Sequence, residues 1–294
     1  MKIVKLKGGL GNQMFQYIFA RYIEERCKEK VLLDFSVYEG RKEDNIRQPR
    51  ITEFDISLNV ASEDEISAVC VLSHKGDMLN NIYRLSIGIE TVINRKYCFQ
   101  KFYKTLSLDE LEKYDYFDGY WQSWRYAVSM ESIIQKEFVP KTSLSAKARV
   151  KVKEIESQSV VFVGIRRGDY VKNKKNLRIY GFIDESFYIR AMEIITQKVG
   201  NVKFHVFSND IKWVKENMNF AQFQVICNEI SEEVTDLEEL IIMSKCSHAI
   251  ISNSTYYWWA AWLIKNPDKV VVAPKRWFAN GRKTEIVPDW WISI

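Results

Sequence analysis

The second half of the chain alternates short apolar runs with stretches of helical periodicity. Continuous apolar runs of this length are typical of strands buried on both faces; they span residues 160–165, 202–207, 223–227, 248–252 and 269–273. Helical spacing fills the intervals, at residues 185–199, 210–218, 236–245 and 256–265. This alternation predicts a parallel sheet with helices on both faces.

The first residues repeat the pattern on a smaller scale. Residues 1–7 are predicted as a strand, residues 8–13 (GGLGNQ) as a turn, residues 14–28 as a helix and residues 30–35 as a second strand. Together they predict a βαβ unit. Residues 40–135 mix polar and aromatic segments without a clear period, so no element order is predicted there.

A change of composition separates the two parts. From Pro140 to Gln158 the chain is rich in Lys, Ser, Glu and Ala, which predicts a linker or a connecting helix. A chain of 294 residues is long enough for two ordinary domains. We therefore expect two domains, at residues 1–148 and at residues 149–294.

Composition narrows the class of protein. Forty-three Lys and Arg against 38 Asp and Glu give a net charge of +5, dispersed along the chain, which does not favour a nucleic-acid partner. The five cysteines form no CxxC pair, so neither disulfides nor a zinc site are predicted. With no secretory leader and no apolar run of membrane-spanning length, we expect a cytoplasmic protein. Peripheral association with the inner face of a membrane through a basic surface stays open.

The first candidate for chemistry is the glycine turn. Gly9 and Gly11 match part of a dinucleotide-binding fingerprint, and Asp34 ends the second strand where a ribose-binding acid would stand, but Met14 replaces the third glycine. An NAD-dependent oxidoreductase and a purely structural turn are therefore alternatives. The amides of Asn12 and Gln13 favour a ligand-facing turn.

The second candidate is the run "GIRRGDYV". Arg166, Arg167 and Asp169 follow the strand at 160–165, at the sheet edge where parallel α/β proteins bind ligands. The planar guanidinium group suits two-point contact with phosphate oxygens, so the pair predicts a nucleoside diphosphate site. A solvated turn in which Asp169 pairs with an arginine is the alternative. Residues 172–178 (KNKKNLR) are expected to form an exposed, mobile loop.

The third candidate opens the helix predicted at 256–265. Ser252, Asn253, Ser254 and Thr255 close a strand and open this helix, so their side chains can cap it while its backbone N–H groups bind an anion. Asp236 begins another helix at the same edge, where its carboxylate could accept hydrogen bonds from guanine; helix capping alone is the alternative in both cases. The nine tryptophans also permit a non-catalytic carbohydrate-binding module, although most aromatic residues are expected in the core.

Two absences bear on cofactors. The chain has no GxxxxGK[ST] phosphate loop and no Asp-x-Asp metal-diphosphate motif. A diphosphate bound without a metal ion requires cationic side chains, so the expectation is an arginine site with no metal and no cofactor.

Taken together, the motifs resemble the α-1,2-fucosyltransferases of glycosyltransferase family 11, in their bacterial form. The resembling segments occur in order from residue 8 to 278: GGLGNQMFQYIFA, GYWQSWRY, GIRRGDYV, FSNDIKWVKENM, DLEELIIMSKCSHAIISNSTYYWWAAWL and VVVAPKRWF. The resemblance implies a GT-B fold of two Rossmann-like α/β domains facing across a cleft. It also implies transfer of fucose, with inversion, from GDP-fucose to the 2-hydroxyl of a galactose-terminated glycan, in surface polysaccharide or O-antigen synthesis.

The resemblance also implies roles for individual donor-side residues. Arg166 corresponds to the β-phosphate ligand, and Arg167 either supports the same charge or stabilises the loop. Asp236 resembles the guanine-recognising acid, and Ser254 and Thr255 resemble phosphate-contacting hydroxyls. Asp169 is expected to organise the site, because an ion pair with an arginine would lower its basicity.

On the acceptor side, Asn12 and Gln13 fall in the loop that faces the cleft, and Gln122 is the candidate acceptor-binding residue. One departure stands out. Gly164 occupies a position at which this motif often carries histidine in these and related fucosyltransferases. This departure leaves another GDP-linked hexose open as the donor.

Overall fold

The computed structural model describes residues 1–38, 49–70, 88–89, 94–100, 104–168, 173–229, 231 and 233–294. These residues divide into two compact units, one of residues 1–142 with 284–286 and one of residues 143–283 with 287–294. The expectation had placed a boundary after residue 148. The stretch predicted as a linker or connecting helix contains helix α7 (Ala146–Glu156), which belongs to the second unit.

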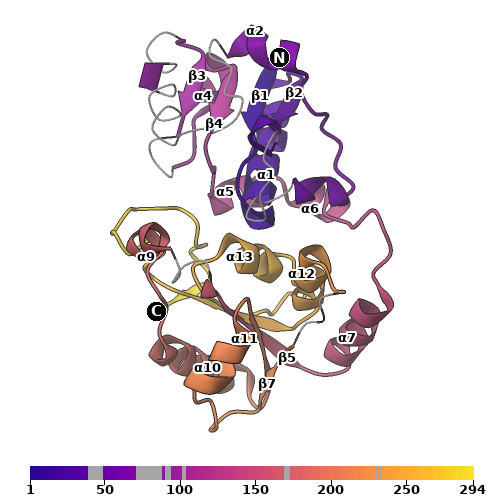
Figure 1. Ribbon diagram of the computed structural model, residues 1–294, viewed down its shortest axis with the longest axis vertical. Helices are drawn as coiled ribbons and strands as arrows, with labels where there is room; N and C mark the ends of the chain where they lie inside the picture. The colour runs from indigo at the N-terminus through magenta and orange to yellow at the C-terminus, as the bar shows by residue number, and fades with distance from the viewer. Residues whose placement is uncertain are drawn as a thin grey trace. The chain divides into compact units, whose positions relative to one another are not determined.

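The first unit is built on a four-stranded parallel sheet in the order β2-β1-β4-β3 (Figure 1). Its strands are β1 (Lys2–Lys5), β2 (Val31–Asp34), β3 (Tyr97–Phe99) and β4 (Tyr116–Asp118). Helix α1 (Leu10–Cys27) packs on one face, where the rings of Phe19 and Phe117 meet edge to face with centroids 5.5 Å apart. The other face forms a separate core with helix α2 (Glu63–Val69). The parallel pairing of β1 with β2 confirms the predicted βαβ opening.

Helix α1 begins four residues earlier than its periodicity predicts. The backbone turns at Gly8, which has a φ of +84°, and Gly9 takes the N-cap position. A left-handed backbone at this point is easily adopted by glycine and strained for other residues. As a result, Asn12 and Gln13 lie in the first turn of the helix rather than in a loop.

Residues 284–286 return to the first unit from near the end of the chain. The Glu285 carboxylate accepts hydrogen bonds from the backbone N–H of Thr105 at 3.0 Å and from its hydroxyl at 2.7 Å. The Glu285 carbonyl accepts from the N–H of Trp124 at 3.1 Å. The remaining described elements of this unit are η1 (Ser36–Tyr38), η2 (Arg50–Glu53), α4 (Leu108–Lys113), α5 (Trp124–Ser129) and α6 (Glu131–Glu137).

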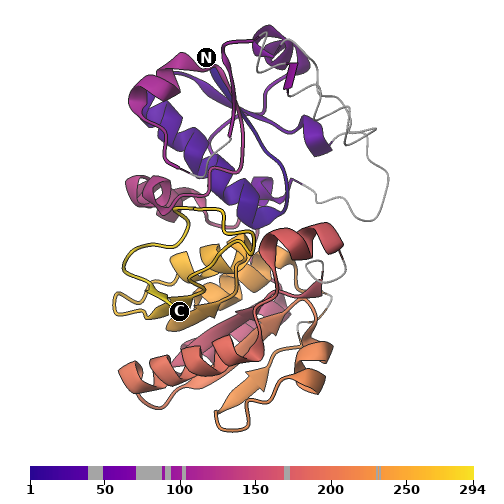
Figure 2. The same ribbon diagram turned by 90° about the vertical axis from the view of Figure 1, so that its left-hand side faces the viewer.

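The second unit holds a six-stranded parallel sheet in the order β10-β9-β8-β5-β6-β7. Helices cover both faces, with α10 and α11 on one side and α12 and α13 on the other (Figures 1 and 2). The strands are β5 (Val160–Ile165), β6 (Lys203–Ser208), β7 (Val225–Cys227), β8 (His248–Ile251), β9 (Val271–Ala273) and β10 (Ile292–Ser293). The helices, besides α7, are α9 (Lys174–Tyr180), α10 (Glu185–Val199), α11 (Ile211–Asn217), α12 (Asp236–Ser244) and α13 (Thr255–Trp262).

The two parallel sheets confirm the predicted fold class of two α/β units. One local prediction was wrong: most of residues 172–178, expected as a mobile loop, belong to helix α9. The backbone N–H of Ala279 donates to the Ile179 carbonyl of this helix at 2.9 Å, and the Tyr180 and Phe278 rings lie 5.8 Å apart. These contacts with a distant segment, which local composition does not show, stabilise the helix. Across the described residues, no helix combines the length and hydrophobicity needed to span a bilayer.

Candidate active site

In the first unit, two predicted site residues meet at the carboxyl edge of the sheet. Gln122 lies in the turn after β4, and its Nε2 donates a hydrogen bond of 2.8 Å to Oδ1 of Asn12 in the first turn of α1. Gly8 provides the space for this amide, since a Cβ at position 8 would lie 2.6 Å from Nδ2 of Asn12. Gly11, also in this turn, is buried within the helix. The structure therefore brings Gly11, Asn12 and Gln122 together.

Buried glutamine amides hold the glycine turn in place. Gln13 is fully buried; its Nε2 donates to the Gly8 carbonyl at 3.0 Å, and its Oε1 accepts from the N–H of Ile51 at 2.9 Å. Gln16 likewise accepts from the N–H of Lys7 at 3.0 Å and donates to the Gly119 carbonyl at 2.9 Å. Gln13 thus supports the turn, whereas the sequence had suggested that it faces a ligand.

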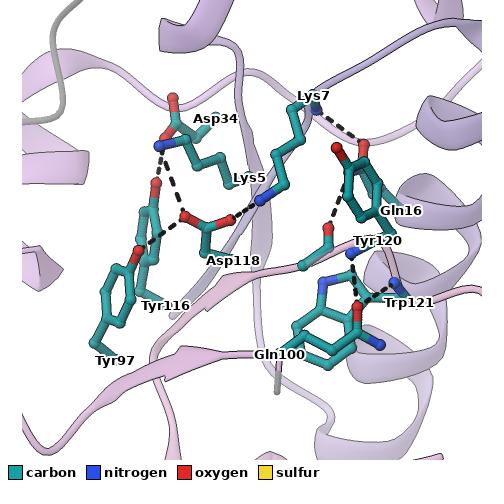
Figure 3. A network of polar contacts seen from close by, with 11 residues as sticks. Lys5, Lys7, Gln16, Asp34, Tyr97, Gln100, Tyr116, Asp118, Tyr120 and Trp121 are labelled. Atoms are coloured by element: carbon teal, nitrogen blue, oxygen red, sulfur yellow. Dashed lines mark hydrogen bonds and ion pairs between the residues drawn. The ribbon is translucent and has the colours of Figure 1, made fainter. Parts of the chain in front are cut away.

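A third amide shapes the turn after β4. Oε1 of Gln100 accepts from the N–H groups of Tyr120 at 2.8 Å and Trp121 at 3.1 Å (Figure 3). Trp121 has a φ of +53°, which is uncommon for a residue with a side chain. Its indole stacks on Phe19, with ring centroids 4.2 Å apart. This turn is fixed both by its hydrogen bonds and by its packing, and it carries Gln122.

A row of buried charges crosses the sheet next to this turn (Figure 3). Lys5, at the end of β1, pairs in register with Asp34 on β2 and with Asp118 on β4, and all three side chains are fully buried. The ammonium group of Lys5 lies 3.8 Å from Asp118, which also forms an ion pair with Lys7 and accepts from the Tyr97 hydroxyl at 2.8 Å. Burial raises the pKa of Asp118, but the ammonium groups of Lys7 and Lys5 outweigh it, and the pKa lies well below its usual value.

Asp34 bears directly on the dinucleotide alternative. Its carboxylate is fully buried, accepts from the N–H of Ser36 at 2.7 Å and receives the Tyr116 hydroxyl. A ribose-binding acid must reach the ligand with its oxygens. In this structure those oxygens serve the interior of the first unit, which counts against the NAD reading.

A cavity of about 480 Å³ adjoins the same turn on the side of edge strand β3. Tyr97, Trp121 and the Gln100 amide contribute to its lining, together with Lys104 and Glu110. Its volume lies within the usual range for small-molecule sites.

In the second unit, Arg166 follows the end of β5. Its backbone N–H donates to Oγ of Ser252 at 3.2 Å, which joins the arginine turn to the segment between β8 and α13. The guanidinium group is within electrostatic range of Glu239 on α12: burial raises the pKa of that carboxyl, and Arg166 opposes the rise. Arg166, Ser252 and Glu239 therefore form one cluster at the carboxyl edge of this sheet.

Arg167 points to different partners. Its Nη1 lies 2.6 Å from Oδ2 of Asp210, and its guanidinium carbon lies 3.9 Å from the centre of the Trp213 ring. Its backbone N–H donates to Oδ1 of Asn209 at 3.0 Å. These contacts join the arginine turn to the start of α11, which fits the stabilising role of the two considered for Arg167. Asp169, expected to organise the site, lies outside the described residues.

The segment from 252 to 255 is largely buried. Nδ2 of Asn253 donates to the carbonyls of Tyr180 at 2.7 Å and Trp277 at 3.0 Å, so this amide links three segments of the unit. Ser254 stands at the N-cap of α13, yet its side chain makes no capping hydrogen bond, contrary to the capping expected from the sequence. Thr255 is half-buried and begins the helix.

Asp236 is exposed at the first position of α12, and Thr235 and Glu238 form the capping box of that helix. Sequence reasoning missed Glu239, one helical turn further on. Its carboxylate lies 3.1 Å from the Tyr256 hydroxyl, which also donates to the Asp236 carbonyl at 2.6 Å. Burial raises the pKa of Glu239 to about 7, against the opposing effects of Tyr256 and Arg166. Its spacing of three residues from Asp236 was the available signal, since both then share a helix face.

A family model described as "Glycosyl transferase family 11" matches the entire chain, residues 1–294. The chain belongs to glycosyl transferase family 11. It is therefore a glycosyltransferase, and the alternatives of an NAD-dependent oxidoreductase and a non-catalytic binding module are set aside.

Relatives of this family 11 chain include two Escherichia coli proteins. The O-antigen biosynthesis glycosyltransferase WbnK is 31% identical over 305 residues, which cover 98% of this chain and 99% of that protein. An alpha-1,2-colitosyltransferase is 28% identical over 303 residues, covering 99% and 98%. Among solved structures, fucosyltransferase NodZ from Bradyrhizobium aligns with 89% of this chain and 92% of its own, at 14% identity and a TM-score of 0.48.

The departure at position 164 of this glycosyltransferase has a steric cause. A Cβ on Gly164 would lie 2.7 Å from Cδ1 and Cδ2 of Tyr257 and still closer to Cγ. Because the Tyr257 ring fills this space, no larger residue fits at position 164 unless the ring moves. Glycine therefore accompanies tyrosine at 257 in this chain.

Proposed function

We propose that this glycosyltransferase moves fucose from GDP-fucose to the 2-hydroxyl of a galactose residue in a glycan, with inversion at the sugar carbon, in surface polysaccharide or O-antigen synthesis. The observation that carries the proposal is the position of Arg166, which follows the carboxyl end of a parallel strand and whose backbone N–H bonds Ser252, in the segment that leads into α13. Sheet edges and helix N-termini of this kind are suited to phosphate groups.

The chemistry follows from the leaving group. As the bond between the anomeric carbon and the β-phosphate oxygen breaks, negative charge grows on that phosphate. A preorganised guanidinium group stabilises the growing charge more than it stabilises the bound donor, and so it lowers the barrier. We assign this role to Arg166. In this proposal Ser254 and Thr255 contact the phosphates, and Arg167 holds the turn through Asp210.

We assign recognition of the guanine base to the helix-α12 carboxylates. Asp236 was the candidate from sequence, and Glu239 shares its helix face and adjoins Arg166. A carboxylate can accept from both N1–H and the exocyclic amino group of guanine. The variants Asp236→Asn and Glu239→Gln separate the two candidates. Only one of them is expected to lower the affinity for GDP relative to the affinity for ADP.

The acceptor is assigned to the first unit. The Asn12 amide, with its orientation fixed by Gln122, would contact the attacking galactose, and the neighbouring cavity lined by Trp121 and Gln100 would hold further sugars. Orientation of the hydroxyl for attack from the face opposite the phosphate supplies much of the rate in such a site. No metal ion is required in this proposal, and activity is expected to persist in EDTA.

A second donor merits a direct comparison. The Escherichia coli alpha-1,2-colitosyltransferase resembles the whole chain about as closely as the first relative does, so nucleotide-activated colitose is the alternative sugar. Both donors should be offered to the purified protein with a panel of galactose-terminated acceptors. Linkage analysis of the product by NMR then tests the α-1,2 assignment. Transfer of colitose but not fucose would overturn the assignment of GDP-fucose as the donor. Transfer of neither sugar would overturn the proposed function.

The role of Arg166 is tested in the same assay. Arg166→Ala is expected to lower the turnover rate by about 100- to 1,000-fold, the usual loss when one transition-state charge contact is removed. Arg190→Ala, an exposed arginine on α10 in the same unit, serves as the matched control and should retain activity. Equal rates for Arg166→Ala and the wild type would remove Arg166 from the mechanism.

A further inference from the structure

The peptide unit between Ile165 and Arg166 is held at both ends by one segment of the second unit. Its N–H, on Arg166, donates to Oγ of Ser252 at 3.2 Å. Its C=O, on Ile165, accepts a long hydrogen bond of 3.4 Å from the Tyr257 hydroxyl, whose single hydrogen is shared with the Phe207 carbonyl at 3.3 Å. Both partners come from the connection between β8 and α13 or from the first turn of that helix. Fixing this peptide plane fixes the position of the Arg166 Cα, from which the side chain extends.

Tyr257 reaches this peptide because Gly164 has no side chain. The Tyr257 ring lies against the Gly164 backbone, where a Cβ could not be accommodated, and the residue is almost completely buried. Its hydroxyl also lies 3.3 Å from the carbonyl of Phe207. Phe207 is on the adjacent strand β6 and pairs in register with Gly164 of β5. The hydroxyl therefore lies between the ends of two neighbouring strands.

Ser252 completes the arrangement from the other side. Its backbone N–H donates to the Gly164 carbonyl at 3.0 Å, while its side chain receives the Arg166 N–H. The last residues of β5 are thus bonded by Ser252 on both sides of Ile165. A fully buried serine with both its backbone and its side chain engaged has little freedom to move.

We propose that Tyr257 is a positioning residue for Arg166. Its ring, seated on Gly164, and its hydroxyl, on the Ile165 carbonyl, set the peptide from which the phosphate-binding guanidinium group extends; Ser252 acts on the same peptide from its N–H side. The inference rests on the role proposed for Arg166 above. In this inference Tyr257 does not contact the donor itself and affects donor binding only through Arg166.

The test uses full-length protein and GDP as the probe, with binding measured by calorimetry. Tyr257→Phe keeps the ring and removes the hydroxyl, so the melting temperature should stay close to that of the wild type. GDP affinity should fall about three- to tenfold, the size of one hydrogen bond. Thr196→Val removes a hydroxyl that bonds the Met192 carbonyl within α10, and this control should leave GDP affinity unchanged.

The decisive comparison repeats Tyr257→Phe in an Arg166→Ala background. If Tyr257 acts through Arg166, adding Tyr257→Phe to the Arg166→Ala protein should lower GDP affinity by less than about twofold. Coupled residues lose their effects together. An equal loss in both backgrounds, or no loss in the wild-type background, would overturn the proposal.

A binding-independent measurement separates this inference from the proposed function. In protein labelled with ¹⁵N-arginine, Tyr257→Phe and Ser252→Ala should each shift the Arg166 amide resonance and speed its hydrogen exchange, whereas Thr196→Val should do neither. An unchanged Arg166 amide in both variants would refute the positioning role even if GDP binds. Failure of the wild-type protein to bind GDP would instead refute the donor site, while the amide signals would still report on Tyr257.

Discussion

Gln122 donates a 2.8 Å hydrogen bond from Nε2 to Oδ1 of Asn12, so two side chains more than a hundred positions apart share one amide contact. An asparagine amide can rotate by half a turn and exchange its oxygen for its nitrogen with little change of shape. In the structure Gln122 is oriented to donate, and the oxygen of Asn12 is the atom that accepts from it. Nδ2 of Asn12 is therefore directed to the opposite side.

Replacing Gln122 by Glu should disturb this orientation with little change in side-chain size. The carboxylate has no hydrogen to donate to Asn12 Oδ1, so the Asn12 amide would rotate or the contact would be lost. We expect transferase activity to fall about tenfold, in line with the loss of one positioned hydrogen bond. Gln135→Glu, at an exposed position on helix α6, is the matched control. Full activity in Gln122→Glu would show that Asn12 orientation is irrelevant.

Gly8 and Gly200 offer a paired test of space against backbone strain. Both have left-handed backbones, with φ of +84° and +83°, but only at Gly8 would a Cβ meet another group, Nδ2 of Asn12 at 2.6 Å. Alanine at either position should lower the free energy of unfolding by about 1–2 kcal/mol through strain. Only Gly8→Ala should also reduce activity strongly. Urea unfolding and initial rates measure the two effects, and equal activity losses would contradict the Asn12 contact.

The buried Lys5–Asp118–Lys7 group should make stability depend on acid pH. The folded pKa of Asp118 lies below its usual value, so the group stabilises the protein above the unfolded pKa of about 3.9 and loses this contribution as pH falls toward the folded pKa. Asp118→Asn should cost about 3–5 kcal/mol at neutral pH, because the buried Lys5 and the partly exposed Lys7 both lose this counter-charge.

Urea unfolding measured between neutral and acid pH checks this prediction. The difference in stability between the wild type and Asp118→Asn should shrink as the solution becomes acid. Asp109→Asn, an exposed position on α4, should change stability by no more than about 0.5 kcal/mol at any pH. A constant difference across the range would mean that the Asp118 charge does not contribute to folding.

Glu239 should have the opposite dependence. Its folded pKa, raised to about 7 chiefly by burial, exceeds the unfolded value of about 4.3, so the folded state binds the proton more tightly and stability falls as pH rises between them. Glu239→Gln should remove this part of the pH profile, whereas Glu193→Gln, exposed on α10, should not. Identical profiles for the wild type and Glu239→Gln would place the titration elsewhere.

The second unit was largely predictable because its central strands β5 and β6 have six residues each and β5 is apolar and buried throughout. The predicted ranges 160–165 and 185–199 coincide with β5 and α10, since buried parallel strands and an amphipathic helix leave clear periods in the sequence. Arg166 was placed correctly at the carboxyl end of β5 for the same reason.

The first unit was harder to predict for physical reasons. Strands β3 and β4 have three residues each, too few to establish a period. Strand β1 was predicted, but its two lysines, Lys2 and Lys5, resemble surface residues and are buried. Their burial depends on partners from distant strands. Likewise, the supporting role of Gln13 and the proximity of Glu239 to Arg166 arise from tertiary contacts that no local pattern records.

The return of residues 284–286 to the first unit limits how this enzyme can be divided. A fragment ending at Thr142 would lack the Glu285 carboxylate, which accepts two hydrogen bonds from Thr105. A fragment beginning at Ser143 would carry that carboxylate without the Thr105 donors. Separate production of the halves calls for the short C-terminal peptide to be supplied in trans or grafted onto the first half. Evolution by simple exchange of whole N-terminal halves between such enzymes would meet the same obstacle.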